Sequence, residues 1–204
     1  MTNKVYIKRY DAPKIDKKEI LRYAGVKLEN GEYDAMLDEL LRSLLPRLSY
    51  RVCYTVLPVE HTAVMTVGGI DFSSDMLASH FSDASCALLF CATVGPEVDR
   101  QLSRLTLRSP TAALLCNAIG TERVESLCDA FCRDVAIADS SLHYRAPRYS
   151  AGYGDLSLDY QRVIFDILSP ERHIGVTLRD SLLMSPSKSV TAFVPLCSPI
   201  TDSI

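Results

Sequence analysis

The stretch Ser85-Cys-Ala-Leu-Leu-Phe-Cys-Ala-Thr-Val-Gly95 decides the fold class of this chain. Within it, Ala87–Thr93 is an apolar run, and Ser85 and Gly95 bound the run on its two sides. A short apolar run between turn-forming residues is typical of a strand buried in the core. We therefore expect a buried central strand here, and the neighbouring segments indicate what surrounds it.

The segments before this run mix helical and extended patterns. In the region 32–46, apolar residues recur at helical spacing and predict an amphipathic helix. Asp16-Lys-Lys-Glu19 has the pattern of a capping box, which opens a short helix that Gly25 ends. Ser73-Ser74-Asp75 predicts the cap of another short helix, which runs to about His80. Strands are predicted at Val5–Lys8, Tyr50–Leu57 and Ala63–Val67, the last closed by Gly68-Gly69.

The segments after the run begin with two predicted helices. Pro96 opens the first helix, and Ser109-Pro110 opens the longest helical segment, to about Asp139. The apolar positions of this long segment change phase near Gly120, which indicates either a kink or contacts on more than one side of the helix. The rest is predicted as a loop at 140–158, a helix at Tyr160–Leu168, and strands at Gly175–Leu178 and Val190–Leu196.

The order of these elements predicts the fold class. Helices and strands are mixed without a regular βαβ rhythm, which favours an α+β fold over a doubly wound one. The chain has neither internal repeats nor a low-complexity tract. We expect a single domain over residues 1–204, with a mostly antiparallel sheet packed against helices.

Composition narrows the class of protein. Of 204 residues 48% are hydrophobic and the formal net charge is −3, which argues against a disordered chain. The balance of 22 Lys and Arg against 25 Asp and Glu argues against a nucleic-acid binder. No apolar stretch is long enough to span a membrane, and the polar start, Met1–Tyr10, lacks the apolar core of a signal peptide. We expect a cytoplasmic protein with neither a nucleic-acid partner nor a membrane partner.

The cysteines do not have the pattern of a disulfide framework, because their number is odd and several lie in apolar runs. Cys128 and Cys132 are four residues apart and are candidates for sharing a metal or a disulfide. The chain has no Cys-x-x-Cys motif and its histidines are scattered, which argues against zinc. We therefore expect reduced, buried thiols and no metal site at Cys53, Cys86, Cys91, Cys116, Cys128, Cys132 and Cys197.

One stretch combines residues that suit a ligand, Arg148-Tyr-Ser-Ala-Gly-Tyr-Gly-Asp-Leu156. Its glycines allow the backbone to approach a ligand closely, and the ring of Tyr153 offers a face on which a flat ligand group can stack. Arg148 offers two donors for a ligand carboxylate. The stretch has neither the pattern of a Walker loop nor that of a dinucleotide-binding loop. An ordinary turn is the alternative interpretation.

Several motifs carry a resemblance to a known family. They are Arg148-x-Ser150-x-Gly152-Tyr153, Gln161, Ile174-Gly175-Val176-x-Leu178 and Met184-x-Pro186-x-x-Ser189-Val190. In order and in interval they resemble the C-terminal activation domain of cobalamin-dependent methionine synthase, most strongly over residues 118–194. Upstream, Ala92-Thr93-Val94-Gly95 and the helix that carries Glu125 are similar to the short, stand-alone activation proteins of the same family.

The resemblance implies a binding site for S-adenosylmethionine. It implies that Arg148 pairs with the ligand carboxylate, because a planar guanidinium can donate two hydrogen bonds to a carboxylate and lysine cannot match this geometry. Ser150 and Gly152 would present backbone groups to the adenosine half, and Tyr153 would pack against the ligand at the methyl-transfer face. Glu125 aligns with a helix glutamate that contacts polar parts of the ligand, and a solvated carboxylate is its alternative interpretation. The resemblance assigns neither a catalytic side chain nor a metal ligand.

The function that the resemblance implies is reductive methylation of cob(II)alamin, with this chain as a stand-alone reactivation subunit. The cobalamin would be carried by a partner methionine synthase that lacks its own activation domain, with flavodoxin or another reductant as electron donor. The chain would thus be a methyltransferase component only together with its partner. Two alternatives stay open: an S-adenosylmethionine-binding docking or sensing module for another corrinoid methyltransferase, without methionine synthesis, and a structural interaction domain.

Overall fold

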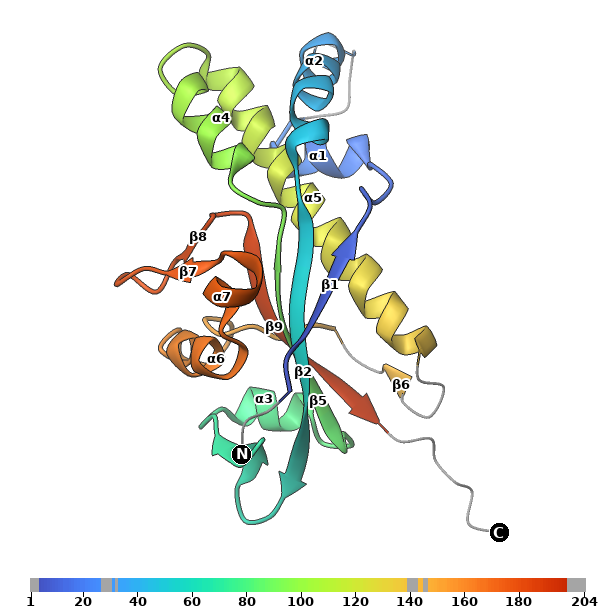
Figure 1. The fold of residues 1–204 in the computed structure, drawn as a ribbon, viewed down its shortest axis with the longest axis vertical. Helices are drawn as coiled ribbons and strands as arrows, with labels where there is room; N and C mark the ends of the chain where they lie inside the picture. The colour runs from blue at the N-terminus through green and yellow to red at the C-terminus, as the bar shows by residue number, and fades with distance from the viewer. Residues whose placement is uncertain (1–3, 27–30, 32, 139–142, 145–146, 198–204) are drawn as a thin grey trace.

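An antiparallel sheet forms the middle of the protein, and helices cover both of its faces (Figure 1). The computed structural model describes residues 4–26, 31, 33–138, 143–144 and 147–197. β1 (Tyr6–Tyr10) pairs with the first half of β2 (Tyr50–His61), and the strand order otherwise is β4-β3-β2-β5-β9-β6. The other strands of this sheet are β3 (Met65–Val67), β4 (Ile70–Asp71), β5 (Cys86–Thr93), β6 (His143–Tyr144) and β9 (Ser189–Cys197). β7 (Thr177–Leu178) and β8 (Met184–Ser185) form a separate two-stranded sheet. The α+β class with a mostly antiparallel sheet is confirmed.

β5 is the central strand that the apolar run predicts, because β2 and β9 flank it along its whole length. Its side chains alternate between the two faces of the sheet, and both faces are covered by helices. This explains why an antiparallel strand has no polar alternation in its sequence. Leu88, Phe90 and Ala92 lie in the core of one face, and Ala87, Leu89 and Cys91 lie in the core of the other.

The long helix α5 (Pro110–Ala138) runs diagonally along one face of the sheet (Figure 1). Around its first half gather α1 (Lys17–Tyr23), α2 (Asp34–Leu44) and α4 (Glu97–Leu105), and a 3-10 turn at Leu45–Arg47 follows α2. The core of the other face is closed by α3 (Asp75–His80), α6 (Tyr160–Leu168) and α7 (Pro170–Ile174). None of the helices in the described part of the chain is long and apolar enough to cross a membrane.

The phase change in α5 has its cause in the packing of this helix. α5 is an unbroken helix, and α1, α2, α4 and the sheet all contact it. At Gly120, a Cβ atom would lie 2.7 Å from Cγ1 of Val98 in α4, so only glycine allows this close approach. The structure thus confirms the interpretation that the helix has contacts on more than one side, and not the interpretation that it is kinked.

The expected elements differ from the observed ones mainly at their ends. The helix at Tyr160–Leu168 has its predicted bounds, whereas the strand that begins at Tyr50 continues through Pro58 to His61. The strand expected at Ala63–Val67 begins at Met65, and the predicted loop at 140–158 contains the two-residue β6 in its described part. The predicted helix end at Asp139 lies outside the described residues. The sequence analysis missed α7, because a five-residue helix is too short to show a period.

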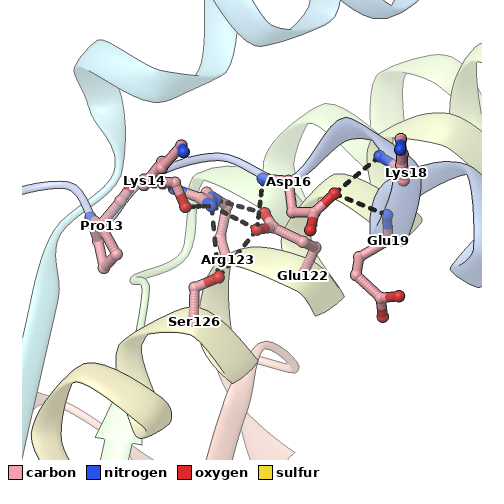
Figure 2. A network of polar contacts seen from close by, with 8 residues as sticks. All are labelled: Pro13, Lys14, Asp16, Lys18, Glu19, Glu122, Arg123 and Ser126. Atoms are coloured by element: carbon pink, nitrogen blue, oxygen red, sulfur yellow. Dashed lines mark hydrogen bonds and ion pairs between the residues drawn. The ribbon is translucent and has the colours of Figure 1, made fainter. Parts of the chain in front are cut away.

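The N-terminal segment is fixed to α5 by buried charges, as Figure 2 shows. Arg123, which is fully buried, donates to the carbonyl oxygens of Pro13 (2.6 Å) and Lys14 (2.8 Å) and forms an ion pair with Glu122. The Asp16 carboxylate caps α1 as predicted, but the backbone N–H of Asp16 donates to the Glu122 carboxylate and not to Glu19, as a capping box would require. The start of the chain and the middle of α5 therefore share one polar network inside the protein.

Candidate functional site

A gap in strand pairing lies along the outer edge of β9. Tyr149 exchanges two backbone hydrogen bonds with Phe193, at 2.9 and 2.7 Å, and continues the sheet for one residue. The chain then turns away: the N–H of Gly152 donates to the carbonyl oxygen of Leu156 (2.8 Å), and Gly152 has a positive φ of 92°. Consequently, β9 has no strand partner on this edge between residues 189 and 192 within the described residues.

A cavity of about 390 Å³ opens at this gap. Its volume is within the range of small-molecule sites in proteins. Its walls come from α5, the turn after Tyr149, α6, β8 and β9. The lining residues are Glu125, Arg148, Tyr149, Ser150, Ala151, Tyr153, Gln161, Met184, Ser189, Val190 and Thr191.

A small group of charges marks one side of the cavity. Nη2 of Arg148 donates to Oε2 of Glu125 (2.7 Å), and Nη1 of Arg148 lies 2.9 Å from Oδ1 of Asp129. The Arg148 side chain is 20% exposed, whereas that of Asp129 is 59% exposed and faces solvent. One guanidinium thus faces two carboxylates, so this group carries a formal charge of −1.

Four of the five residues predicted for the site line this cavity: Glu125, Arg148, Ser150 and Tyr153. Tyr153 is 69% exposed, so its ring stands at the mouth of the cavity with most of its surface in solvent. Gly152 is not among the lining residues, and its N–H is already used within the turn. Arg148 and Glu125, for which the resemblance implies separate ligand contacts, contact each other here.

The turn that carries Tyr153 is fastened to α3 by Asp155. The Asp155 carboxylate accepts hydrogen bonds from the Ser74 hydroxyl and from the backbone N–H groups of Asp75 (2.8 Å) and Met76 (3.2 Å). These hydrogen bonds, that of Ser74 above all, hold the pKa of Asp155 below its ordinary value. The carboxylate is therefore charged at neutral pH and links the turn to the N-terminus of α3.

Replacing Asp155 with alanine is expected to loosen this turn, while Asp155→Asn keeps one acceptor and loses less. Because the pKa of Asp155 is lowered in the folded state, its contribution is present at neutral pH and is lost only as the pH falls below 3.8. Limited proteolysis of the turn measures the effect. Asp83→Ala, at an exposed aspartate, is the control, and equal behaviour of Asp155→Ala and this control would contradict the assignment.

The structure adds residues that the sequence analysis did not assign to the site. Asp129 lies one helical turn after Glu125, and this spacing was the available signal for it. Gln161 belongs to one of the family motifs, but its burial inside the cavity wall was not foreseen. Met184 begins another of the family motifs but was not assigned to the site, and Thr191 reaches the cavity only through the tertiary fold, because no local pattern distinguishes it from other strand residues.

The cysteines are free thiols, and those at 53, 91, 116, 128 and 197 are buried. In the part of the chain that the structure describes, no three His, Cys, Asp or Glu side chains gather as metal ligands would. Burial raises the pKa of Cys116 and of Cys132 to about 11 and raises that of Cys128 further. At neutral pH these side chains are therefore protonated and poorly nucleophilic.

Consequently, a thiol reagent is expected to label the native protein slowly and the unfolded protein at all seven cysteines. Mass spectrometry of the labelled protein with and without denaturant counts the modified residues. Metal analysis is expected to find no stoichiometric zinc or iron. Rapid labelling of Cys128 in the native protein, or one metal ion per chain, would contradict this interpretation.

Comparison with known proteins supports the fold but does not identify a family. The chain is similar to the crystal structure of the MetH reactivation domain bound to AdoHcy, with a TM-score of 0.64 and 14% sequence identity. The similarity covers 95% of this chain and 78% of that one. No family model matches the sequence, and no curated protein matches it significantly. At this identity the likeness establishes the α+β fold.

Proposed function

We propose that this chain binds S-adenosylmethionine and supports reductive methylation of cob(II)alamin in a partner methionine synthase that lacks its own activation domain. The observation that carries the proposal is the cavity at the β9 edge, which Arg148 and Glu125 line, with Asp129 paired to Arg148 beside it. Two findings add support: the family motifs around Arg148, and a fold shared with a reactivation domain that was crystallised with AdoHcy.

The charges of the site fit an amino-acid ligand that carries a further positive charge. In the proposed complex, the Arg148 guanidinium binds the ligand carboxylate, and the Glu125 and Asp129 carboxylates attract the ammonium group. The formal charge of −1 on these three residues complements the net positive charge of S-adenosylmethionine, whose sulfonium adds to its ammonium. The exposed ring of Tyr153 at the mouth suits a contact with the sulfonium end.

The proposed reaction depends on how the methyl donor and the cobalt are positioned, and it requires no acid or base from this chain. A reductant such as flavodoxin supplies one electron to cob(II)alamin held by the partner, and the reduced cobalt accepts the methyl group of the sulfonium. S-adenosylhomocysteine is the product left in the cavity. In this proposal the chain aligns the sulfonium with the cobalt, and no side chain of the chain gains or loses a proton.

The test is to restore methylation in a cognate synthase that lacks its own activation domain. With S-adenosylmethionine and a reductant, the chain is expected to convert cob(II)alamin to methylcobalamin, as followed by absorbance, whereas alone it should not methylate homocysteine. Tyr153→Ala is expected to slow this conversion roughly tenfold or more, because the ring lies where ligand and partner meet. Binding of the ligand to this variant should change much less.

Tyr6→Ala is the matched control, since Tyr6 is also exposed but stacks on Tyr54 of the sheet. It should leave both the conversion and the binding unchanged. If the wild-type chain binds S-adenosylmethionine but accelerates nothing with a cognate partner, the reactivation function is wrong. The alternative of a docking or sensing module for another corrinoid methyltransferase then takes its place.

A further inference from the structure

The open edge of β9 presents two backbone groups to the cavity. Phe193 exchanges both of its outward hydrogen bonds with Tyr149, so its N–H and C=O point away from β5. Because strand geometry repeats every two residues, the N–H and C=O of Thr191 point to the same side. The chain enters a turn at Ser150, whose carbonyl accepts the N–H of Tyr153, before it reaches the position opposite Thr191. Neither group of Thr191 has an outward hydrogen bond within the described residues.

These two groups require a partner. Thr191 is 1% exposed, and buried backbone donors and acceptors are almost always paired with protein, water or ligand. Thr191 lines the cavity, so the partner has to enter from there. The edge thus offers one donor beside one acceptor in a fixed geometry.

Gln161 adds another donor at the same place. It is 4% exposed and lines the cavity from α6. Its Oε1 accepts a hydrogen bond from Oγ1 of Thr191 (3.0 Å), which fixes the orientation of the side-chain amide. The amide nitrogen makes no hydrogen bond within the described residues, so its N–H groups stay available to a molecule in the cavity.

We propose that Gln161 and the backbone of Thr191 form the subsite that reads the heterocycle of the ligand and selects a 6-aminopurine over a 6-oxopurine. Adenine presents N7 and N1 as acceptors on either side of its 6-amino donor, which matches two protein donors and one acceptor. In hypoxanthine the 6-oxo group is an acceptor and N1 carries a proton. The Thr191 carbonyl would then face another acceptor, and the Thr191 N–H would face another donor. This inference rests on the proposed adenosyl ligand and adds the residues that discriminate its ring.

The selection is measured by calorimetry on the isolated chain with S-adenosylhomocysteine and S-inosylhomocysteine. Wild type is expected to bind the inosyl compound roughly tenfold or more weakly, because buried groups are then left unpaired. Gln161→Ala should weaken binding of the adenosyl compound and reduce the discrimination. Arg162→Ala, at the exposed neighbour on α6, is the control and should change neither.

The backbone contact is measured by NMR on the wild-type protein, which does not depend on the folding of a variant. Addition of S-adenosylhomocysteine is expected to shift the amide proton of Thr191 downfield and to slow its exchange. The amide of Phe193 is already bonded to Tyr149 and should change little. Equal affinity for the two compounds, or an unchanged Thr191 amide in the bound protein, overturns the subsite alone. Absence of binding by either compound overturns the proposed function together with it.

Discussion

Arg148→Ala is expected to weaken S-adenosylmethionine binding by about 2–4 kcal/mol, which is roughly 30- to 700-fold in Kd. The variant loses the charge-assisted partner of the ligand carboxylate. It also leaves the Glu125 and Asp129 carboxylates without the guanidinium that pairs with both of them. Since Asp129 is largely exposed, its charge is solvated and the fold should survive. Calorimetry gives the Kd, and thermal unfolding checks the fold.

Arg148→Lys separates charge from geometry. Lysine keeps the positive charge but not the planar fork that reaches Glu125 and Asp129 at the same time, so it should recover only part of the affinity. Arg162→Ala removes an exposed arginine outside the cavity lining and should bind as wild type does. Wild-type affinity in Arg148→Ala, with the protein folded, would remove Arg148 from the site.

Arg123→Ala is expected to lower the free energy of unfolding by about 3–5 kcal/mol, because a buried ion pair loses one partner. The Glu122 carboxylate, whose side chain is 3% exposed, would be left without its guanidinium. The carbonyl oxygens of Pro13 and Lys14 would lose their donors, so the segment before α1 should detach from α5 (Figure 2). Urea unfolding measures the loss.

Arg22→Ala provides the contrast, since Arg22 forms an exposed pair with Glu19 on α1 and should change stability very little. Arg123→Lys, which keeps the charge with fewer donors, should lie between wild type and Arg123→Ala and remains measurable if the alanine variant does not fold. If Arg123→Ala unfolds at the same urea concentration as Arg22→Ala, the network adds nothing to stability.

Much of the fold was predictable from local patterns. The apolar run at Ala87–Thr93, the helical spacing in α2 and the cap at Asp16 each reflect short-range chemistry, and the structure confirms them. Strand ends were less predictable: β2 continues beyond Leu57 because β3 and a backbone bond from Val59 to Ser85 extend its pairing. β3 follows β2 closely in the chain and Ser85 lies further along it, and the apolar pattern of β2 itself carries no information about either partner.

The site was predictable to a smaller extent. The residue types from Arg148 to Tyr153 made this stretch a candidate for ligand binding, and the resemblance added Glu125. The two neighbours that change the chemistry, Asp129 and Gln161, needed the fold: the first contacts Arg148 across helix and loop, and the second is buried under the β9 edge. Arg123 shows the same limit, because a charged pair on a long helix is typical of a solvated face and here it is buried.

The position of β5 between β2 and β9 has a consequence for how the chain acquires its structure. β2 precedes β5 in the chain, whereas β9 is synthesised only after α6 and α7. Until β9 arrives, one long edge of β5 is unpaired. Contacts between such distant segments are associated with slow folding, and exposed apolar strand edges are where aggregation competes with it. The time during which this protein is exposed to aggregation therefore ends only when β9 pairs with β5, even if β2 and β5 pair early.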